Sequence, residues 1–165
     1  MLPNVVPITR APAAAQPEKR LVLRMLDLWR HARHEEHLPP VGALTVADTG
    51  ADADYVYTID CSNDNEARFA HVGAALRVAG WPSDEAALVA ACPENSVLGL
   101  TSRYWREIVE RGVPVTRGGV GRHDGHPVLY RSIMVPLVDQ SGKISLIVGA
   151  VNWRTVEEQD GTPIE

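Results

Sequence analysis

The stretch RGGVGRHDGHPV, residues 117–128, is the part of the sequence whose residue types most suggest chemistry. Gly119, Gly121 and Gly125 follow the spacing G-x-G-x-x-x-G, which is one residue longer than a dinucleotide-binding fingerprint. A strand rather than a helix is predicted to follow, so no helix N-terminus is available to hold a phosphate. Asp124 and Gly125 between apolar runs instead predict a two-residue type I′ hairpin turn.

The histidines raise the possibility of a metal site. The stretch HARHEEH places His31, His34 and His37 near the end of a predicted helix, and His123 and His126 flank the predicted hairpin turn. Neither group matches H-E-x-x-H, and no carboxylate or cysteine has metal-site spacing to them. We therefore predict no metal, with His123 and His126 in solvent; a zinc or nickel site at the first three histidines is the alternative.

A catalytic centre is weakly indicated. There is no G-x-S-x-G motif, and Cys61 and Cys92 stand at a turn and before a proline, where small structural residues are expected. His71 alternates with Phe69 on one face of a predicted strand, either as a core histidine or as a ligand contact. It is the best general acid or base, but no second catalytic group can be named. We predict no catalytic residues, and an enzyme is the less favoured alternative.

Composition places the chain among single-domain globular proteins. Its 165 residues are 45% hydrophobic and 22% charged, and the net charge of -5 argues against nucleic acid binding. Residues 103–131 nonetheless carry six arginines against three acids, a polarity suited to steering a partner. Two cysteines without a C-x-x-C pair indicate a reducing, cytoplasmic location, and no apolar run is long enough to span a membrane.

The spacing of apolar residues predicts an α+β order of elements. A helix over 18–38 comes first, followed by two strands, several short helices, one longer helix and a three-stranded meander. This order predicts an antiparallel sheet with helices on one side. After the first helix, the expected ranges are 54–60 and 66–73 for the strands, 74–97 for the short helices, 101–112 for the longer helix, and 113–120, 126–139 and 143–153 for the meander.

With this element order, the chain resembles a bacterial group of PAS-like proteins over about residues 20–153. The resemblance is carried by MLDLWRHAR, by RFAHVGAAL, by YWREIVERGVPVTRGG and by YRSIMVPLVDQSGKISLIVGAV. It implies an α+β fold with a five-stranded antiparallel sheet in the order 2-1-5-4-3, short helices on one face and an N-terminal helix on the other. The expected division is a flexible tail at 1–17, the helix at 18–38, the PAS-like domain at 52–155 and a flexible tail at 156–165.

The resemblance also implies two sites. A pocket is expected between the sheet and the helices, and the N-terminal helix is expected to help form a homodimer. The cysteine motif of flavin photosensors is absent, and residues 98–112 hold no histidine for a haem, so the cofactor stays unknown. The expected pocket residues are Phe69, His71, Trp81, Tyr104, Trp105, Ile108 and Met134, and the expected dimer residues are Leu21, Met25, Leu28 and Trp29.

The function implied is that of a stand-alone sensory or regulatory module that binds a small molecule or a partner protein. Because few residues lie outside the predicted domain, its output is expected to pass through a separate effector protein. A pure protein-interaction module without a ligand is the alternative. The motifs of this resemblance are structural, so they predict a fold more firmly than a function.

Overall fold

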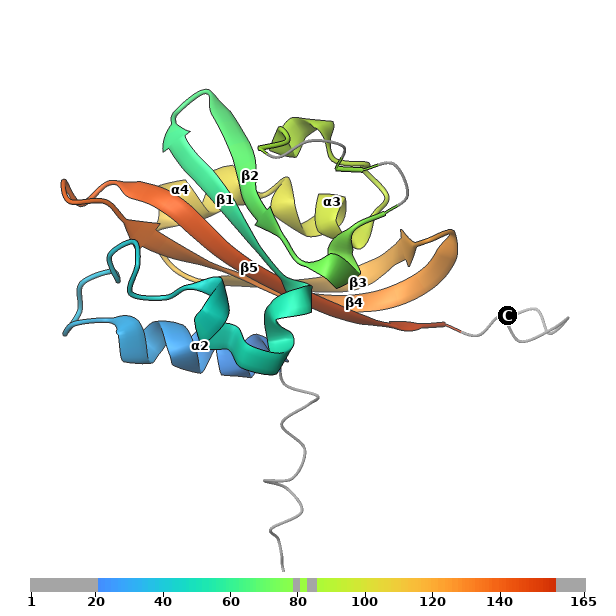
Figure 1. Ribbon diagram of the computed structural model, residues 1–165, viewed down its shortest axis with the longest axis horizontal. Coiled ribbons are helices and arrows are strands. Elements are labelled where there is room, and N and C mark those ends of the chain that lie inside the picture. The colour runs from blue at the N-terminus through green and yellow to red at the C-terminus, as the bar shows by residue number, and fades with distance from the viewer. Residues whose placement is uncertain (1–20, 79–80, 83–85, 157–165) are drawn as a thin grey trace, which may run out of the picture.

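The computed structural model describes residues 21–78, 81–82 and 86–156 (Figure 1). The expected tail at 1–17 and the expected tail at 156–165, apart from Val156, lie outside the described residues, as do the first three positions of the predicted N-terminal helix. Among the described residues, no helix has the length and apolar composition needed to cross a membrane.

One five-stranded antiparallel sheet forms the centre of the molecule, and its order β2-β1-β5-β4-β3 confirms the expected one. The two pairs that are joined by short turns, β1 with β2 and β3 with β4, lie at opposite edges of the sheet, and β5 lies between β1 and β4. The strands are β1 (Val56–Asn63), β2 (Glu66–Val72), β3 (Val115–His123), β4 (His126–Val138) and β5 (Ile144–Thr155).

The outer face of the sheet is covered by the helix α2 (Leu21–Ala32), with the 3-10 segment η3 (Val46–Tyr55) beside it. Leu21, Met25 and Trp29 of α2 are buried against Ile133, Val135 and Val148 of the sheet. The indole Nε1 of Trp29 donates a hydrogen bond to the carbonyl of Pro136 at 2.9 Å. The apolar stripe of this helix is therefore used inside the chain, as the sheet-packing interpretation predicts.

The helix α2 ends at Ala32, so the predicted end at residue 38 is wrong. The amide of Arg33 makes the last helical hydrogen bond, to the carbonyl of Trp29 at 3.2 Å. Glu35 then adopts a φ of 60°, and the amide of His37 donates back to His34 in a tight turn. A left-handed residue cannot continue a right-handed helix, so the chain reverses before the two prolines are reached.

The inner face of the sheet is covered by η4 (Ala74–Leu76), η5 (Val89–Ala91), α3 (Val97–Ser102) and α4 (Trp105–Arg111). The single helix predicted over 101–112 is therefore wrong, because the chain forms two short helices there. Ser96 caps α3 by accepting a hydrogen bond from the amide of Gly99 at 3.0 Å. Gly112 ends α4 with a φ of 66° in the left-handed region.

The β3–β4 turn confirms the predicted type I′ hairpin. Asp124 and Gly125 both have positive φ, at 50° and 80°. The expectation that His123 lies in solvent is wrong, because its ring packs on Trp153 with the ring centroids 4.3 Å apart. The neighbouring strand β5 extends far enough along β4 to place an aromatic side chain beside the turn.

Candidate functional site

The space between the sheet and the inner helices is filled by side chains of the chain itself. Phe69, Trp105, Ile108 and Met134, four of the predicted pocket residues, are at most 9% exposed and belong to one hydrophobic cluster. The other two aromatic residues of the prediction, Trp81 and Tyr104, pack partly buried against the same cluster. These residues are thus brought together as predicted, as core packing.

His71 does not share the buried face with Phe69, so this part of the sequence prediction is wrong. The register between β1 and β2 shifts by one residue, since Thr58 pairs with His71 whereas Ile59 pairs with Phe69. The extra residue in β2 is a β-bulge, which turns His71 to the opposite face, where it is exposed. The ring is still partly shielded from water, and this partial burial, with the neighbouring Arg77, lowers the pKa of His71 below its usual value.

A buried polar pair joins the sheet to α3. The hydroxyl of Tyr57 lies 2.9 Å from the hydroxyl of Thr101, and both residues are fully buried. Burial raises the pKa of Tyr57 above its usual range. Gly149 on the neighbouring β5 makes room for the ring of Tyr57, because a Cβ at this position would overlap the ring. This pair fixes the inner helices on the sheet.

The two cysteines are free and buried. Burial raises the pKa of both thiols to about 11, so each is protonated at neutral pH. Cys61 lies 3.9 Å from the carbonyl of Ile144, and Cys92 lies 3.7 Å from the hydroxyl of Ser96. These are the surroundings of structural cysteines, because a reactive thiol needs a stabilised thiolate.

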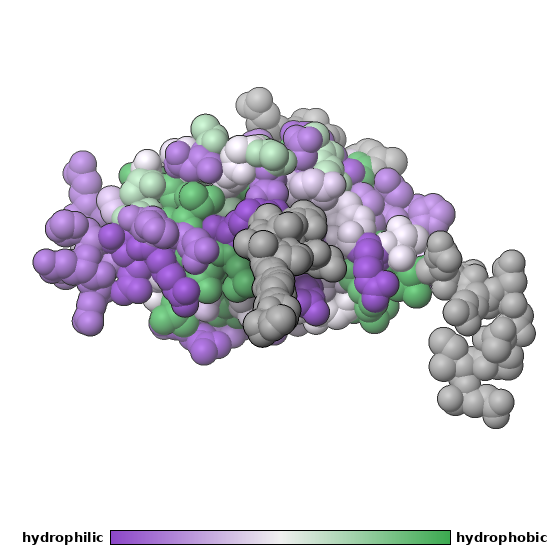
Figure 2. All heavy atoms as spheres, turned by 90° about the horizontal axis from the view of Figure 1, so that it is seen from below, coloured by the Kyte–Doolittle hydropathy of each residue, from purple (hydrophilic) through white to green (hydrophobic). Residues whose placement is uncertain are grey.

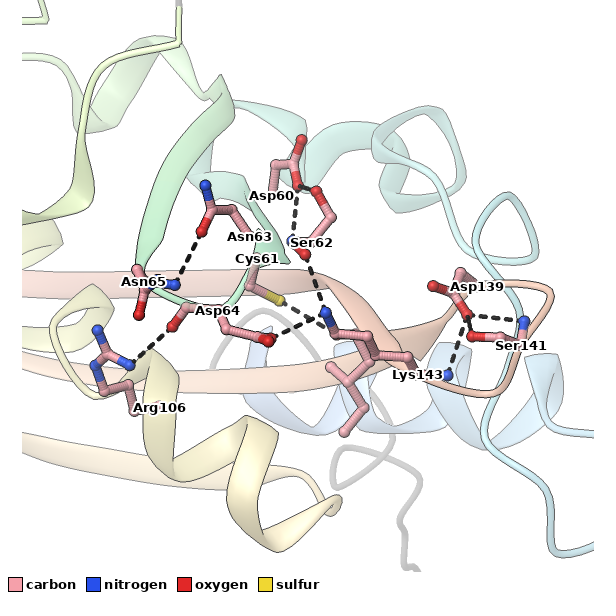
Figure 3. Close-up of polar contacts among 11 residues, drawn as sticks. Asp60, Cys61, Ser62, Asn63, Asp64, Asn65, Arg106, Asp139, Ser141 and Lys143 are labelled. Atoms are coloured by element: carbon pink, nitrogen blue, oxygen red, sulfur yellow. Dashed lines mark hydrogen bonds and ion pairs between the residues drawn. The ribbon is translucent and has the colours of Figure 1, made fainter.

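The polar residues beside Cys61 connect two turns of the sheet (Figure 3). Lys143, from the β4–β5 turn, donates to the carbonyl of Ser62 at 3.0 Å and pairs with Asp64 at 2.9 Å. Arg106 of α4 reaches the carbonyl of Asp64 at 3.1 Å. The other contacts drawn there lie mostly within single turns, as between Asp139 and Ser141, so we interpret the cluster as structural.

No group of three or more His, Cys, Asp or Glu side chains is placed to hold a metal ion among residues 21–78, 81–82 and 86–156. His34 and His37 face each other across the turn that follows α2, but His31 bonds instead to the carbonyl of Asp27 at 2.7 Å. The three histidines of the alternative metal hypothesis therefore do not converge.

The outer face carries two adjoining hollows where α2 leaves the sheet uncovered. Their volumes are about 660 and about 440 Å³, and both are lined by Gly118, Arg131 and Asn152. These three residues are direct neighbours on β3, β4 and β5, and the absence of a side chain at Gly118 deepens the surface. We name the combined hollow the outer groove; its further lining includes Leu129 and Arg154 at one end and Val22, Leu23 and Thr116 at the other.

The charge of the outer groove is positive. Arg131 and Arg154 are exposed on the same face of the sheet, and neither makes an ion pair or hydrogen bond within the described part of the chain. Across the edge strand, Arg117 stacks over the ring of Tyr104 and pairs with Glu107, which also binds Arg111. The guanidinium of Arg111, with that of Arg117, lowers the pKa of Glu107.

The sequence analysis did not predict the outer groove. The signal was present in β5, where Asn152 and Arg154 alternate with the buried Val151 and the half-buried Trp153. Without the register of β4 against β5, however, their alignment with Arg131 could not be seen. Figure 2, which looks onto the α2 side, shows hydrophilic residues gathered mainly where α2 ends, with apolar residues in smaller patches.

No protein-family model and no curated protein matches the chain. Among solved structures, it is similar to the PAS domain of BvgS from Bordetella pertussis, with 21% identity over 61% of this chain and 73% of that chain and a TM-score of 0.38. It is also similar to a fungal LOV domain photoreceptor, with 14% identity over 87% of this chain and 99% of that one and a TM-score of 0.37. Likeness of this degree concerns the fold and carries no information on ligand or partner.

The strand order, the short helices on the inner face and α2 on the outer face together give the chain a PAS-like α+β fold.

Proposed function

We propose that the chain is a PAS-type regulatory module that acts by binding a partner protein on its outer sheet face, with no ligand between the sheet and the inner helices. The filled inner space carries this proposal. Tyr57, Phe69 and Ile108 occupy the volume in which a ligand would lie, and each is at most 2% exposed. A ligand there would have to displace close-packed side chains.

The outer groove supports the second half of the proposal. It combines the cations of Arg131 and Arg154, which have no ion-pair partner among the described residues, with the exposed apolar side chain of Leu23. Protein interfaces use such mixtures of arginine and apolar surface. Signalling would then pass to a separate effector protein, and two free cysteines support the cytoplasmic location that this proposal includes.

A small-molecule sensor is the second candidate, because one surface hollow is lined by two of the predicted pocket residues. It has a volume of about 370 Å³ and is lined by Phe69, His71, Arg77 and Pro82. With its pKa lowered, His71 is neutral at pH 7 and able to accept a hydrogen bond there. No carboxylate bonds to His71 among the described residues, so the acid–base pair of the enzyme alternative lacks its second member.

We also propose that the chain forms a homodimer, but three of the four predicted dimer residues are not available for the contact. Leu21, Met25 and Trp29 are at most 4% exposed within one chain. Leu28 and Leu23, on the more exposed sides of α2, would have to form the contact. Light scattering after size exclusion tests this: Leu28→Glu should halve the mass, and a mass unchanged by this variant would exclude α2 from the dimer.

Site-specific photo-cross-linking tests the docking face. A photoreactive amino acid replaces Leu129 in the outer groove or, as a matched control, the exposed Ala91 of η5 on the helix side. We expect a defined cross-linked protein from position 129 in the cells of origin and none from position 91. Equal products from both positions, or none from 129, would refute the proposal.

A further inference from the structure

The two edge strands of the sheet differ in how much of their backbone is hydrogen-bonded to neighbouring segments. The β2 edge is covered, since the amide of Phe69 donates to the carbonyl of Ala87 at 2.8 Å and Arg68 forms a bridge with Leu88. Among the residues that the structure describes, the β3 edge is bonded only near its end, where the amide of Arg122 donates to the carbonyl of Asn95 at 3.1 Å. An open edge is a template for another strand, which natural sheets usually protect.

The hairpin fixes which backbone groups point outward from β3. In a two-residue hairpin the flanking residues, His123 and His126, form a hydrogen-bonded pair, and bonded and non-bonded pairs then alternate along the strands. Thr116, Gly118 and Val120 fall in the non-bonded positions, so their amides and carbonyls point away from β4. Arg122 also falls in a non-bonded position, and its amide donates a hydrogen bond away from β4, to the carbonyl of Asn95.

Glycines keep this edge accessible. β3 is 9 residues long and holds Gly118, Gly119 and Gly121 but no proline. Its central residues are exposed, with Val120 at 70%. A second backbone can therefore approach closely, because few side chains shield the amides.

The charges beside the edge select an acidic occupant. Arg122, Arg131 and Arg154 are all exposed on the outer-face side, and Glu107, which reaches β3 from the inner side, is already held by two arginines. Two copies pairing through β3 would bring the same arginines together, which disfavours a second copy as the occupant. Carboxylates on a partner strand would instead meet Arg122 of β3 and, across Gly118, which has no side chain, Arg131 of β4.

We propose that β3 is a docking edge for an extended, acidic segment of the partner protein, which adds to the sheet as a further strand beside Thr116, Gly118 and Val120. This inference rests on the proposed function and names the chemistry of its partner. The backbone bonds supply affinity, and Arg122 and Arg131, which are exposed on the outer-face side, select carboxylates at alternate positions.

The probe is a short synthetic peptide of alternating glutamate and valine, with a lysine and valine peptide as its control. Titrated into the full chain at low salt, the glutamate peptide should shift the amide resonances of Thr116, Gly118 and Val120 and slow their hydrogen exchange. The lysine peptide should not. No change up to millimolar glutamate peptide, or changes that omit this edge, would overturn the proposal.

Two variants at one position sharpen the test. Val120→Pro removes an outward amide without breaking a hydrogen bond to β4, so the fold should tolerate it. This variant should bind the glutamate peptide about tenfold or more weakly than the wild type. Val120→Ala keeps the amide and should bind within about twofold of wild type. Equal binding by both variants would refute strand addition.

Two further results separate the competing explanations. Protection of these amides by rising protein concentration alone would make a second copy the occupant and refute the acidic segment. If the cross-link from position 129 persists while the edge shows none of the expected changes, the proposed function stands and only this inference fails.

Discussion

At the scale of single residues, burial decides the chemistry of the two cysteines. A pKa of about 11 leaves about one thiol in a thousand ionised at pH 8, so Cys61 and Cys92 should resist alkylation in the folded chain. Mass spectrometry after iodoacetamide treatment measures this, with the urea-unfolded chain as the control. Rapid modification of either residue at pH 7 in the folded chain would show that it is not buried as described.

The raised pKa values of the two thiols also make the stability of the fold depend on pH. Because the folded pKa of each thiol lies above its usual 9.0, folding favours the protonated form. Stability from this source is fully present below pH 9 and is lost as the pH rises towards 11.

The contact between Gly149 and Tyr57 is tightly constrained packing. Gly149→Ala should cost about 1–3 kcal/mol in urea unfolding, because its Cβ overlaps the Tyr57 ring. Gly119→Ala is the matched control, since a Cβ there lies at an ordinary 3.6 Å from Tyr130. Equal losses from both substitutions would mean that the cost comes from the strand backbone and not from the ring.

At the scale of elements, α2 is part of the core and not an appendage. Met25→Ala should destabilise the chain by about 2–5 kcal/mol, because its side chain is 0% exposed between α2 and the sheet. Leu23→Ala, at a position that is 48% exposed, should change the free energy of unfolding by less than about 0.5 kcal/mol. A Met25→Ala loss as small as that of Leu23→Ala would show that α2 detaches from the sheet.

The sequence predicted the elements more reliably than their local irregularities. Alternation and turn residues located β1 to β5 and the Asp124-Gly125 turn, because these are local signals. The bulge that exposes His71 and the left-handed Glu35 that ends α2 depend on tertiary contacts. The division of the longer helix was missed for a related reason, since Thr101 and Ser102, at the start of the predicted helix, are buried at the end of α3.

The predicted sites show the same limit. Apolar residues of the right type were gathered correctly around Phe69 and Trp105, but sequence alone could not tell a pocket from a packed core. The outer groove depends on the register that aligns Gly118, Arg131 and Asn152 across three strands. Long-range pairing of this kind leaves no short motif.

At the scale of the whole molecule, one sheet separates two functions. The inner layer is closed by side chains such as Tyr57 and Ile108, whereas the outer layer ends where α2 leaves Arg131 and Arg154 uncovered. We therefore propose that the inner layer and α2 stabilise the fold, and that the uncovered part of the outer face, with its open β3 edge, binds the partner.

Native mass spectrometry of the chain purified from its cells of origin under non-denaturing conditions tests this division most directly. We predict masses of the polypeptide, alone or as a dimer, with no small molecule retained, because Phe69, Trp105 and Met134 fill the inner space. A stoichiometric small molecule that is lost together with the fold, and whose binding Met134→Trp abolishes, would contradict the account.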